Sequence, residues 1–591
     1  MERLMLTSAR LTSALWRHRT ALAIGLVGTL AANGFALLQP YLLGRGIDLI
    51  TRGHAGLVLP IALALVAAAA ADAASRFTQR FAINGASRRM EAELREELFA
   101  KLEQLDQRFF QEIRTGDVMA RATNDLAAVQ QLLGMGLSNI VNTVVIFVAA
   151  VVLMAVIDWQ LTVLSVSLLV VLTLGFTLLG PVIQRRFLRV QEQFAALSSR
   201  AQENLSGIRV VKAYVQEDAQ ADTFRAANEE YVQANMAWAR INSALWPLFA
   251  AVAGLAGLVL LYVGGQHVAA GRLSLGQFVQ FNYYLILLSW PLIALGWVTN
   301  MFQQGAASLN RIEAILHRQP AIASPPHPIR PTAVRGEILF DDVGYAYGEE
   351  PVLRHFTLHV PAGSTVAIVG TTGAGKSTIA RLLTRVDDPQ AGRILLDGVD
   401  LRDLPLDFLR GLVGYVPQET FLFSESLLEN ITLGAPDAPA EAVTHAVELS
   451  QLSADLEQFP GGLQTVIGER GVTLSGGQKQ RTAIARAVIK DPAVLVIDDA
   501  LSSVDTRTEE AILRGLRDFM KDRTSLVIAH RISTIRDADK IVVLEDGRII
   551  EEGPHRALLA QGGVYARLYQ RQQWRRQLEE DEIVGAEVSG Q

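Results

Sequence analysis

The first half of the chain is dominated by long apolar runs separated by polar stretches. A membrane-spanning helix needs about 20 predominantly apolar residues. Six runs reach that length, near residues 20–43, 55–75, 133–157, 159–181, 243–270 and 278–303. This pattern predicts an all-α transmembrane domain of six helices within residues 20–310.

The connections between these runs are very unequal in length. Three are short, and the third and fourth runs are separated by little more than Asp158. The other two are long polar stretches that keep a helical apolar period, with Leu94, Leu98 and Leu102 at spacings of four. We therefore expect membrane helices that continue far into the cytosol and reverse near residues 109–125 and 203–217. A solvated hairpin and a docking surface are both compatible with such tips.

Positive charge indicates the orientation of the domain. Basic residues are frequent before the first run and in both long connections, and rare in the short ones. Because cations accumulate on the cytoplasmic side, the N-terminal segment 1–19 and the long connections are predicted to be cytoplasmic. A cleaved signal peptide is the alternative for the N-terminus, but the first run is too long for one and further spans follow.

Polar and aromatic residues inside the predicted spans leave two interpretations open. The polar ones are Asn33, Gln39, Asp72, Asn142, Gln280 and Asn282. An intramembrane polar residue marks a functional site or a hydrogen bond between helices. The sixth span is rich in aromatic rings, which could line an apolar cavity or anchor the helix at the membrane interface.

The second half of the chain has a different composition. Prolines concentrate in residues 311–335, which are predicted to form an extended linker. Residues 336–575 show the short apolar strands and turns of a soluble α/β domain, and the acidic tail 576–591 is expected to be disordered. The net charge of −6 argues against nucleic-acid binding, and the absence of cysteine excludes disulfides and cysteine-ligated zinc.

A glycine-rich loop in this half carries the clearest chemistry. Residues 370–378 read Gly-Thr-Thr-Gly-Ala-Gly-Lys-Ser-Thr, after an apolar strand at 366–369 and before a helix that includes 379–383. In such a loop backbone amides approach phosphates, Lys376 reaches the β- and γ-phosphates, and the Ser377 hydroxyl can hold Mg²⁺. The predicted ATP-binding residues here are Thr371, Thr372, Gly373, Ala374, Gly375, Lys376, Ser377 and Thr378.

A second glycine-rich string follows about a hundred residues later. It consists of Leu474, Ser475, Gly476, Gly477 and Gln478, and it opens a helix predicted over residues 479–489. Amides at a helix start can also face an anion. Because one nucleotide needs only one phosphate loop, the second string suggests that two such domains enclose ATP between them.

This pair of motifs resembles the nucleotide-binding domain of the ATP-binding cassette (ABC) family. The resemblance implies that Tyr347 stacks on adenine, that Gln418 contacts Mg²⁺, and that Asp498 orients Mg²⁺ at the end of the strand 494–498. It further implies that residues 465–471 meet the cytosolic tips, that His530 contacts the γ-phosphate, and that the first tip contains a coupling helix. Ser503 and Asp505 resemble the loop that crosses the dimer interface.

One residue departs from the family pattern. Glutamate usually follows the Walker B aspartate and polarises the attacking water, whereas this chain has Asp499. Aspartate is one methylene shorter, and a base must lie within hydrogen-bonding reach of the water. The resemblance then implies a heterodimeric exporter in which the site built on this chain is degenerate. A homodimer that uses Asp499 as its base is the alternative.

The resemblance covers nearly the whole chain and implies a half-transporter of the multidrug-exporter type in the cell inner membrane. Its N-terminus and nucleotide-binding domain would be cytoplasmic, and ATP and Mg²⁺ would be its cofactors. The implied partners are a second half-transporter chain, the lipid bilayer and an amphipathic, hydrophobic or lipid-like substrate, with no nucleic acid. A nucleotide-gated regulatory membrane protein is the alternative from a different class.

Overall fold

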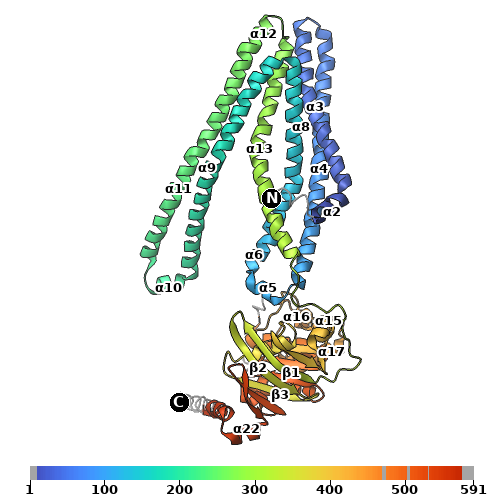
Figure 1. Ribbon diagram of the computed structural model, residues 1–591, viewed down its shortest axis with the longest axis vertical. Helices are drawn as coiled ribbons and strands as arrows, with labels where there is room; N and C mark the ends of the chain where they lie inside the picture. The colour runs from blue at the N-terminus through green and yellow to red at the C-terminus, as the bar shows by residue number, and fades with distance from the viewer. Residues whose placement is uncertain (1–8, 469–473, 502–505, 530, 575–591) are drawn as a thin grey trace. The chain divides into compact units, whose positions relative to one another are not determined.

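The computed structural model describes residues 9–468, 474–501, 506–529 and 531–574, and these residues form two compact units (Figure 1). The first unit holds the chain up to Glu103 together with Thr115–Arg318. The second holds Gln104–Arg114 together with the chain from Gln319 onward. The tip of the first cytosolic connection therefore belongs to the nucleotide-binding unit, although its sequence lies between the second and third predicted spans.

The first unit is entirely helical. Its helices are α2 (Ala9–Arg17), α3 (Arg19–Thr51), η1 (Ala55–Leu57), α4 (Val58–Gln104), α6 (Thr115–Ala120), η2 (Arg121–Asp125), α7 (Leu126–Gln131), η3 (Leu132–Gly136), α8 (Leu137–Ile157), α9 (Trp159–Ser206), α10 (Ile208–Ala213), α11 (Glu217–Val259), η4 (Leu260–Gly264), α12 (Gly265–Ala269) and α13 (Leu275–Leu316). The segments η2, η3 and η4 are π-helical turns within longer helices.

Among the described residues, four helical stretches are long and apolar enough to cross a membrane: Arg19–Thr51, Val58–Gln104, Thr115–Ile157 and Ala250–Ala269. They contain the first, second, third and most of the fifth predicted spans. The predicted spans 159–181 and 278–303 lie within α9 and α13. Helix α13 continues to Leu316, past the predicted start of the linker at residue 311, so the linker begins later than expected.

The turn between α8 and α9 is as short as the sequence indicates. Asp158 alone separates the two helices, and its carboxylate accepts a hydrogen bond from the Leu161 amide at 3.0 Å. His267 Nδ1 lies 2.6 Å from the other carboxylate oxygen of Asp158 and ties α12 to the same turn.

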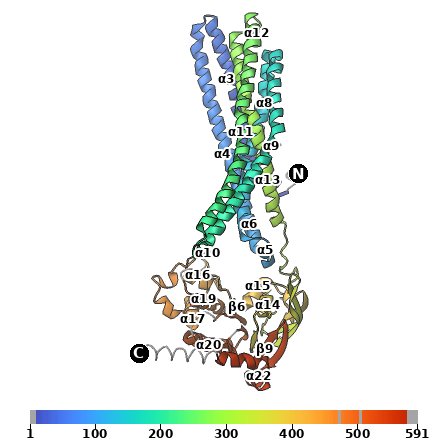
Figure 2. The ribbon, with the colours of Figure 1, turned by 90° about the vertical axis from the view of Figure 1, so that its left-hand side faces the viewer.

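The long helices separate into a packed group and a hairpin. Helices α9 and α11 run side by side and are joined by α10, whose described residues are not buried (Figures 1 and 2). Helices α3, α8 and α13 pack around Met154, Phe281, Tyr284 and Leu288. Tyr284 donates a hydrogen bond to the Leu37 carbonyl at 3.0 Å. Phe281 and Tyr284 of the aromatic sixth span are therefore part of the helix packing.

The tip of the first connection contains α5 (Gln107–Glu112). Asp106 caps this helix, with its Oδ1 accepting from the Phe109 amide at 3.3 Å and its Oδ2 accepting from the Ala321 amide at 2.9 Å. Phe109 is buried within the second unit. The first tip is therefore in contact with the segment that follows α13.

The second unit is built on two sheets. The four-stranded sheet has the order β2-β1-β4-β5, and its paired strands are antiparallel. The six-stranded sheet has the order β10-β9-β3-β8-β7-β6, with parallel pairing throughout except between β10 and β9. The strands are β1 (Ile338–Tyr347), β2 (Glu350–Val360), β3 (Thr365–Gly370), β4 (Ala391–Leu396), β5 (Val399–Asp400), β6 (Val413–Val416), β7 (Val494–Asp498), β8 (Thr524–Ile528), β9 (Lys540–Glu545) and β10 (Arg548–Gly553).

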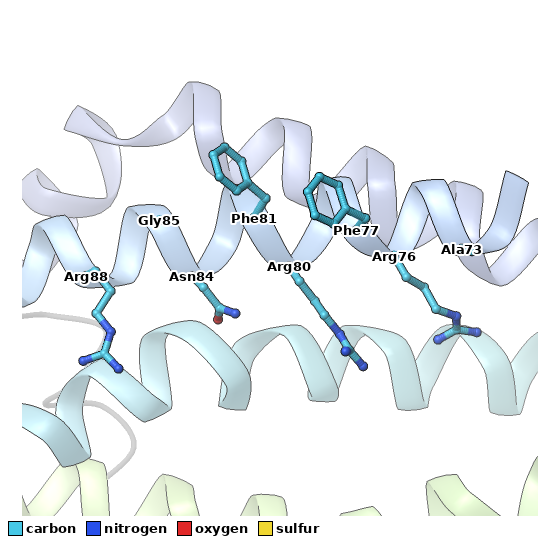
Figure 3. A pocket seen from close by; sticks show the side chains of 8 residues that line it. All are labelled: Ala73, Arg76, Phe77, Arg80, Phe81, Asn84, Gly85 and Arg88. Atoms are coloured by element: carbon cyan, nitrogen blue, oxygen red, sulfur yellow. The ribbon is translucent and has the colours of Figure 1, made fainter. Parts of the chain in front are cut away.

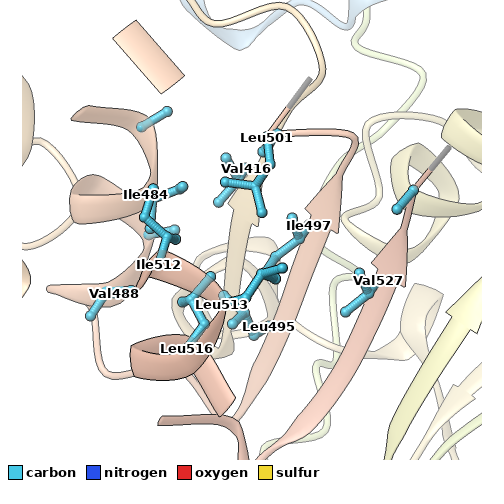
Figure 4. Close-up of a cluster of buried hydrophobic side chains, with 14 of the residues drawn as sticks. Val416, Ile484, Val488, Leu495, Ile497, Leu501, Ile512, Leu513, Leu516 and Val527 are labelled. Carbon is cyan, nitrogen blue, oxygen red and sulfur yellow. The ribbon is translucent and has the colours of Figure 1, made fainter. Parts of the chain in front are cut away.

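Helices pack against the two sheets and against one another. They are α14 (Lys376–Leu383), η5 (Leu401–Asp403), α15 (Leu406–Leu412), α16 (Leu427–Thr432), α17 (Ala440–Leu449), α18 (Ser453–Leu456), η6 (Gly462–Gln464), α19 (Gly476–Val488), α20 (Thr506–Met520), α21 (Ile532–Ile535) and α22 (His555–Gln561). Leu495 and Ile497 of β7 pack with Ile484 of α19 and Ile512 of α20 in one apolar cluster (Figure 4). Val494 and Val496 alternate with them and pack in the second cluster, so β7 is buried on both faces.

Candidate nucleotide site

Parallel pairing brings the predicted phosphate loop and the predicted Walker B strand to one edge of the sheet. Strands β3 and β7 both pair in parallel with β8, which lies between them. Because parallel strands end at the same edge, the loop after Gly370 and the carboxylates of Asp498 and Asp499 lie together. This edge is the usual ligand site of an open α/β sheet.

The loop backbone requires glycine at two places. Gly373 and Gly375 have φ values of 85° and 99°, in the region that side chains disfavour. A Cβ on Gly375 would lie 2.9 Å from Leu353 Cδ2 and 3.1 Å from the Val352 carbonyl, whereas a Cβ on Gly373 would meet open space. Gly375 is also the N-cap of α14 and supplies no side-chain cap, so the first amides of the helix are available to an anion.

Lys376 is held inside the loop. Its Nζ donates to the carbonyl oxygens of Gly370 at 3.0 Å and Thr371 at 2.8 Å, and the residue is buried. Burial lowers the pKa of the ammonium, while the nearby carboxylates of Asp499 and Asp498 act in the opposite direction. The positive charge therefore lies at the centre of the cradle, where phosphate oxygens would bind.

Ser377 and Asp498 form the polar floor of the site. The Ser377 hydroxyl donates to Asp498 Oδ1 at 3.1 Å, and Asp498 is 2% exposed. A hydroxyl and a carboxylate beside phosphates fit Mg²⁺, which prefers oxygen ligands and commonly keeps waters and substrate phosphates in its coordination shell. Gln418 follows β6, the neighbour of β7, and its side chain is exposed. The described residues contain no group of three or more His, Cys, Asp or Glu side chains that could hold a metal by themselves.

Tyr347 lies beside α14, the helix that follows the phosphate loop. Its hydroxyl is 3.5 Å from Thr378 Oγ1, and the Arg381 guanidinium lies 5.6 Å from the ring centroid. The residue is 39% exposed, so it is only partly covered by its neighbours.

Asp499 has an unusual backbone conformation. Its φ is 48°, in the left-handed region that is uncommon for residues other than glycine. Its amide donates to the Ile528 carbonyl at 2.8 Å, which anchors the backbone to the end of β8. Both observations concern the backbone of Asp499, which is anchored to the end of β8.

A buried glutamate near Asp499 was missed by the sequence analysis. Glu509 on α20 is 2% exposed and forms an ion pair with Arg531, and its Oε1 accepts from Thr534 Oγ1 at 3.0 Å. Asp499, Glu509, Arg531 and Thr534 all line one small cavity. Arg531, directly after His530 in the sequence, could have indicated this glutamate. An arginine that packs against the domain needs a carboxylate to balance its charge.

The second glycine-rich string starts a helix earlier than predicted. Helix α19 begins at Gly476, three residues before the expected start at 479. Ser475 is its N-cap and forms a capping box with Gln478: the Gln478 amide donates to Ser475 Oγ at 3.3 Å and the Ser475 amide donates to Gln478 Oε1 at 2.9 Å. The sequence pattern already contained this box, because glutamine follows serine at the third position.

The capping box leaves backbone amides of the second glycine-rich string free to bind a phosphate. Amides in the first helical turn have no acceptor within the helix, so Gly476 and Gly477 can present theirs to a ligand. Gln478 Nε2 also donates to Asp455 Oδ1 at 3.1 Å, which fixes the side chain against α18. Leu474 is buried and anchors the string in the apolar core.

Several predicted site residues lie outside the described residues. They are Ser503, Asp505 and His530, together with positions 469–471 of the loop predicted to meet the cytosolic tips.

Comparisons with known proteins identify the architecture. The model for the ABC transporter transmembrane region matches residues 22–292, and the ABC transporter model matches residues 353–502. The chain is 38% identical over 556 residues to the probable multidrug resistance ABC transporter ATP-binding/permease protein YheI of Bacillus subtilis, covering 93% of this chain and 95% of that protein. It is 36% identical to the multidrug resistance-like ATP-binding protein MdlA of Escherichia coli, covering 91% and 92%.

Two further relatives are informative. The ATP-dependent lipid A-core flippase of Syntrophus aciditrophicus is 32% identical, with coverage of 94% of this chain and 92% of that protein. The solved structure of a bacterial Atm1-family ABC exporter with ATP bound superposes with a TM-score of 0.77 at 32% identity, covering 94% of this chain and 98% of that chain. The chain therefore belongs to the ABC transporter family, as an exporter half-transporter whose cytoplasmic ATPase domain is coupled to transport across the membrane.

Proposed function

We propose that this chain is one subunit of a heterodimeric exporter that moves amphipathic or hydrophobic compounds out of the cell. The observation that carries the heterodimer is Asp499, which stands where the family has its catalytic glutamate. Relatives named as multidrug resistance proteins and as a lipid A-core flippase support a substrate with apolar character.

The proposed ATP site is built on this chain's phosphate loop. Residues 371–378 bind the phosphates, Tyr347 stacks on adenine, and Ser377, Asp498 and Gln418 hold Mg²⁺. Mg²⁺ in this position neutralises charge that develops on the phosphates. Lys376 stabilises the same charge, Asp499 orients the attacking water, and His530 contacts the γ-phosphate.

The backbone geometry of Asp499 supports slow hydrolysis at the proposed site. A carboxylate that is one methylene too short could approach the water only if its backbone moved towards it. The hydrogen bond from the Asp499 amide to Ile528 opposes that movement. A misplacement of about 1 Å can lower a rate on the order of a hundredfold.

The second string would serve the other nucleotide site of the dimer. Leu474, Ser475, Gly476, Gly477 and Gln478 would face the phosphates bound to the partner chain, with Ser503 and Asp505 at the dimer interface. Their capping box is complete, so this chain can supply a preorganised half of a site whose loop and glutamate come from the partner.

The test is the ATPase rate of the purified full-length chain, alone and after co-expression with a second half-transporter chain that has glutamate after its Walker B aspartate. We expect feeble turnover alone and at least about a tenfold gain with the partner. Robust turnover by the chain alone that disappears in Asp499→Asn would instead establish a homodimer with Asp499 as base.

Transport is tested separately from hydrolysis. Inverted vesicles that contain the complex should accumulate a fluorescent amphipathic dye against a gradient when ATP is added. ATP binding without such accumulation would support a nucleotide-gated regulatory protein.

A further inference from the structure

A buried carboxylate on α20 holds the α21 turn, which consists of residues 531–534. Glu509 is 2% exposed, and its two carboxylate oxygens contact two different residues of this turn. One oxygen pairs with the Arg531 guanidinium, and the other accepts a hydrogen bond from the Thr534 hydroxyl at 3.0 Å. Because a buried carboxylate is costly unless it is paired and hydrogen-bonded, these contacts hold the turn against α20.

A residue near the C-terminus holds the same turn at a second point. The Ile532 amide donates a hydrogen bond to Gln572 Oε1 at 2.9 Å. Ile532 is the first residue of α21, and an amide in the first turn of a helix has no acceptor within that helix. Gln572 therefore supplies an acceptor that α21 itself cannot provide.

The residues before position 530 are anchored by the sheet. The Ala529 amide donates to the Ile368 carbonyl of β3 at 3.4 Å, and the Ile528 carbonyl accepts from the Asp499 amide at 2.8 Å. In the sequence, His530 therefore stands between a segment that the sheet fixes and a turn that two distant side chains fix.

The cavity beside Asp499 is enclosed by several elements. Its lining comes from β7, β8, α20 and α21 and from the residues that follow the two strands. The groove along α4 differs, because every residue that lines it belongs to that one helix (Figure 3). Asp499, Glu509 and Arg531 share the enclosed cavity, and charges at a buried site interact more strongly than charges in water.

We propose that Glu509 and Gln572 are positioning residues for recognition of the γ-phosphate. They hold Arg531 and Ile532, and thereby the backbone that leads into His530. Neither residue touches the nucleotide in this proposal, and each acts through the turn. The inference rests on the proposed contact between His530 and the γ-phosphate, and it adds the groups that maintain this contact.

The test compares nucleotides with and without a γ-phosphate. The full-length chain is titrated with AMP-PNP or ADP in the presence of Mg²⁺, and the ratio of the two Kd values measures the preference for the γ-phosphate without hydrolysis. We expect Glu509→Gln, which keeps the shape of the side chain but removes its charge, to lower this preference by about tenfold. Its ADP affinity should stay within about twofold of the wild type, and Gln572→Ala should lower the preference by about threefold.

Matched controls separate positioning from a general effect on the domain. Glu510→Gln makes the same chemical change at the next residue of α20, which is exposed, and should leave the preference unchanged. Gln573→Ala is the corresponding control for Gln572. If Glu509 acts through His530, adding Glu509→Gln to His530→Ala should cause no further loss of the preference.

Four results would overturn the proposal. An equal loss of affinity for AMP-PNP and ADP in Glu509→Gln would assign Glu509 to stability alone. A full further loss on adding Glu509→Gln to His530→Ala would place its effect elsewhere. An unchanged preference in Glu509→Gln together with a loss in His530→Ala would reject this inference and leave the proposed role of His530 intact. An unchanged preference in His530→Ala would reject that role and the inference together.

Discussion

The Ser377 hydroxyl lies 3.1 Å from Asp498 Oδ1 and donates a hydrogen bond to it, which joins the first turn of α14 to the end of β7. These are two of the three side chains that would hold Mg²⁺ in the proposed site. This contact therefore links the phosphate loop directly to its acidic partner at the end of β7.

Ser377→Ala should remove the Mg²⁺-dependent part of ATP affinity and leave binding in EDTA almost unchanged. Nucleotide affinity measured across a Mg²⁺ titration checks this, with an expected loss of about tenfold at saturating Mg²⁺. Ser364→Ala is the control, because that exposed hydroxyl bonds only to the nearby Pro361 carbonyl. Equal Mg²⁺ dependence in wild type and Ser377→Ala would contradict the assignment of Ser377.

The two loop glycines should tolerate alanine differently. Both have positive φ, but only at Gly375 does an added Cβ meet neighbours, at 2.9 Å from Leu353 Cδ2. We therefore expect Gly375→Ala to abolish ATP binding, and Gly373→Ala to weaken it by about tenfold or less through backbone strain of roughly 1 kcal/mol. Binding of a fluorescent ATP analogue distinguishes them, and equal effects would argue against the crowding at Gly375.

Asp499→Glu should accelerate hydrolysis if the missing methylene limits the rate. The longer side chain restores reach while the backbone stays anchored to Ile528. We expect at least about a tenfold gain in the ATPase rate of the complex, with ATP affinity unchanged. The control is Asp499→Asn, which keeps the size of the side chain but removes the carboxylate base, and it should not accelerate hydrolysis. A slower rate in Asp499→Glu would show that this site is adapted to aspartate.

Asp125 and Arg311 join the cytosolic extension after α6 to the end of α13. Arg311 Nε donates to Asp125 Oδ2 at 2.8 Å, and Ser308 Oγ donates to Asp125 Oδ1 at 2.9 Å. The Arg311 guanidinium is the main reason that the pKa of Asp125 is lowered. Asp125→Asn should destabilise the protein by about 2 kcal/mol, because it weakens hydrogen bonds to a buried charged group. Thermal unfolding in detergent should show a lower Tm for Asp125→Asn. The control is Asp117→Asn, which changes an exposed residue of α6 and should leave the Tm unchanged.

The nucleotide-binding unit should lose stability in mild acid because of His555. Its Nδ1 lies 2.6 Å from the Tyr565 hydroxyl, and the ring packs edge-on against Tyr565 and Tyr569. Burial, assisted by Arg536, lowers the pKa of His555 below its usual value near 6.5. The unfolded chain therefore binds a proton before the folded one does. Stability from this group is complete above about pH 6.5 and falls as the pH drops towards the lower folded pKa.

His555→Gln should reduce this acid sensitivity. The measurement is Tm between pH 7.5 and pH 5.5, roughly spanning the range in which histidine titrates. His445→Gln, an exposed histidine of α17, should keep the slope of the wild type. An unchanged slope in His555→Gln would assign the acid sensitivity to other groups.

Much of the architecture could be predicted because its signals are local. The phosphate loop, its flanking strand and helix, and the strand that ends in Asp498 are continuous segments, and each appears in the structure near its predicted place. The helix after the second string begins three residues before its predicted start, because Ser475 and Gln478 form a capping box there. The linker also begins later than predicted, because α13 continues to Leu316 beyond its apolar, membrane-like part.

The sequence by itself determined the spans, the phosphate chemistry and the substitution at position 499, because hydropathy and motif spacing depend on neighbouring residues. Tertiary structure alone decided which distant groups meet. Ser377 contacts Asp498 across 121 residues, Arg311 contacts Asp125 across 186, and α5 belongs to the nucleotide-binding unit. Such pairs follow from strand order and helix packing, which bring together side chains that no local pattern connects.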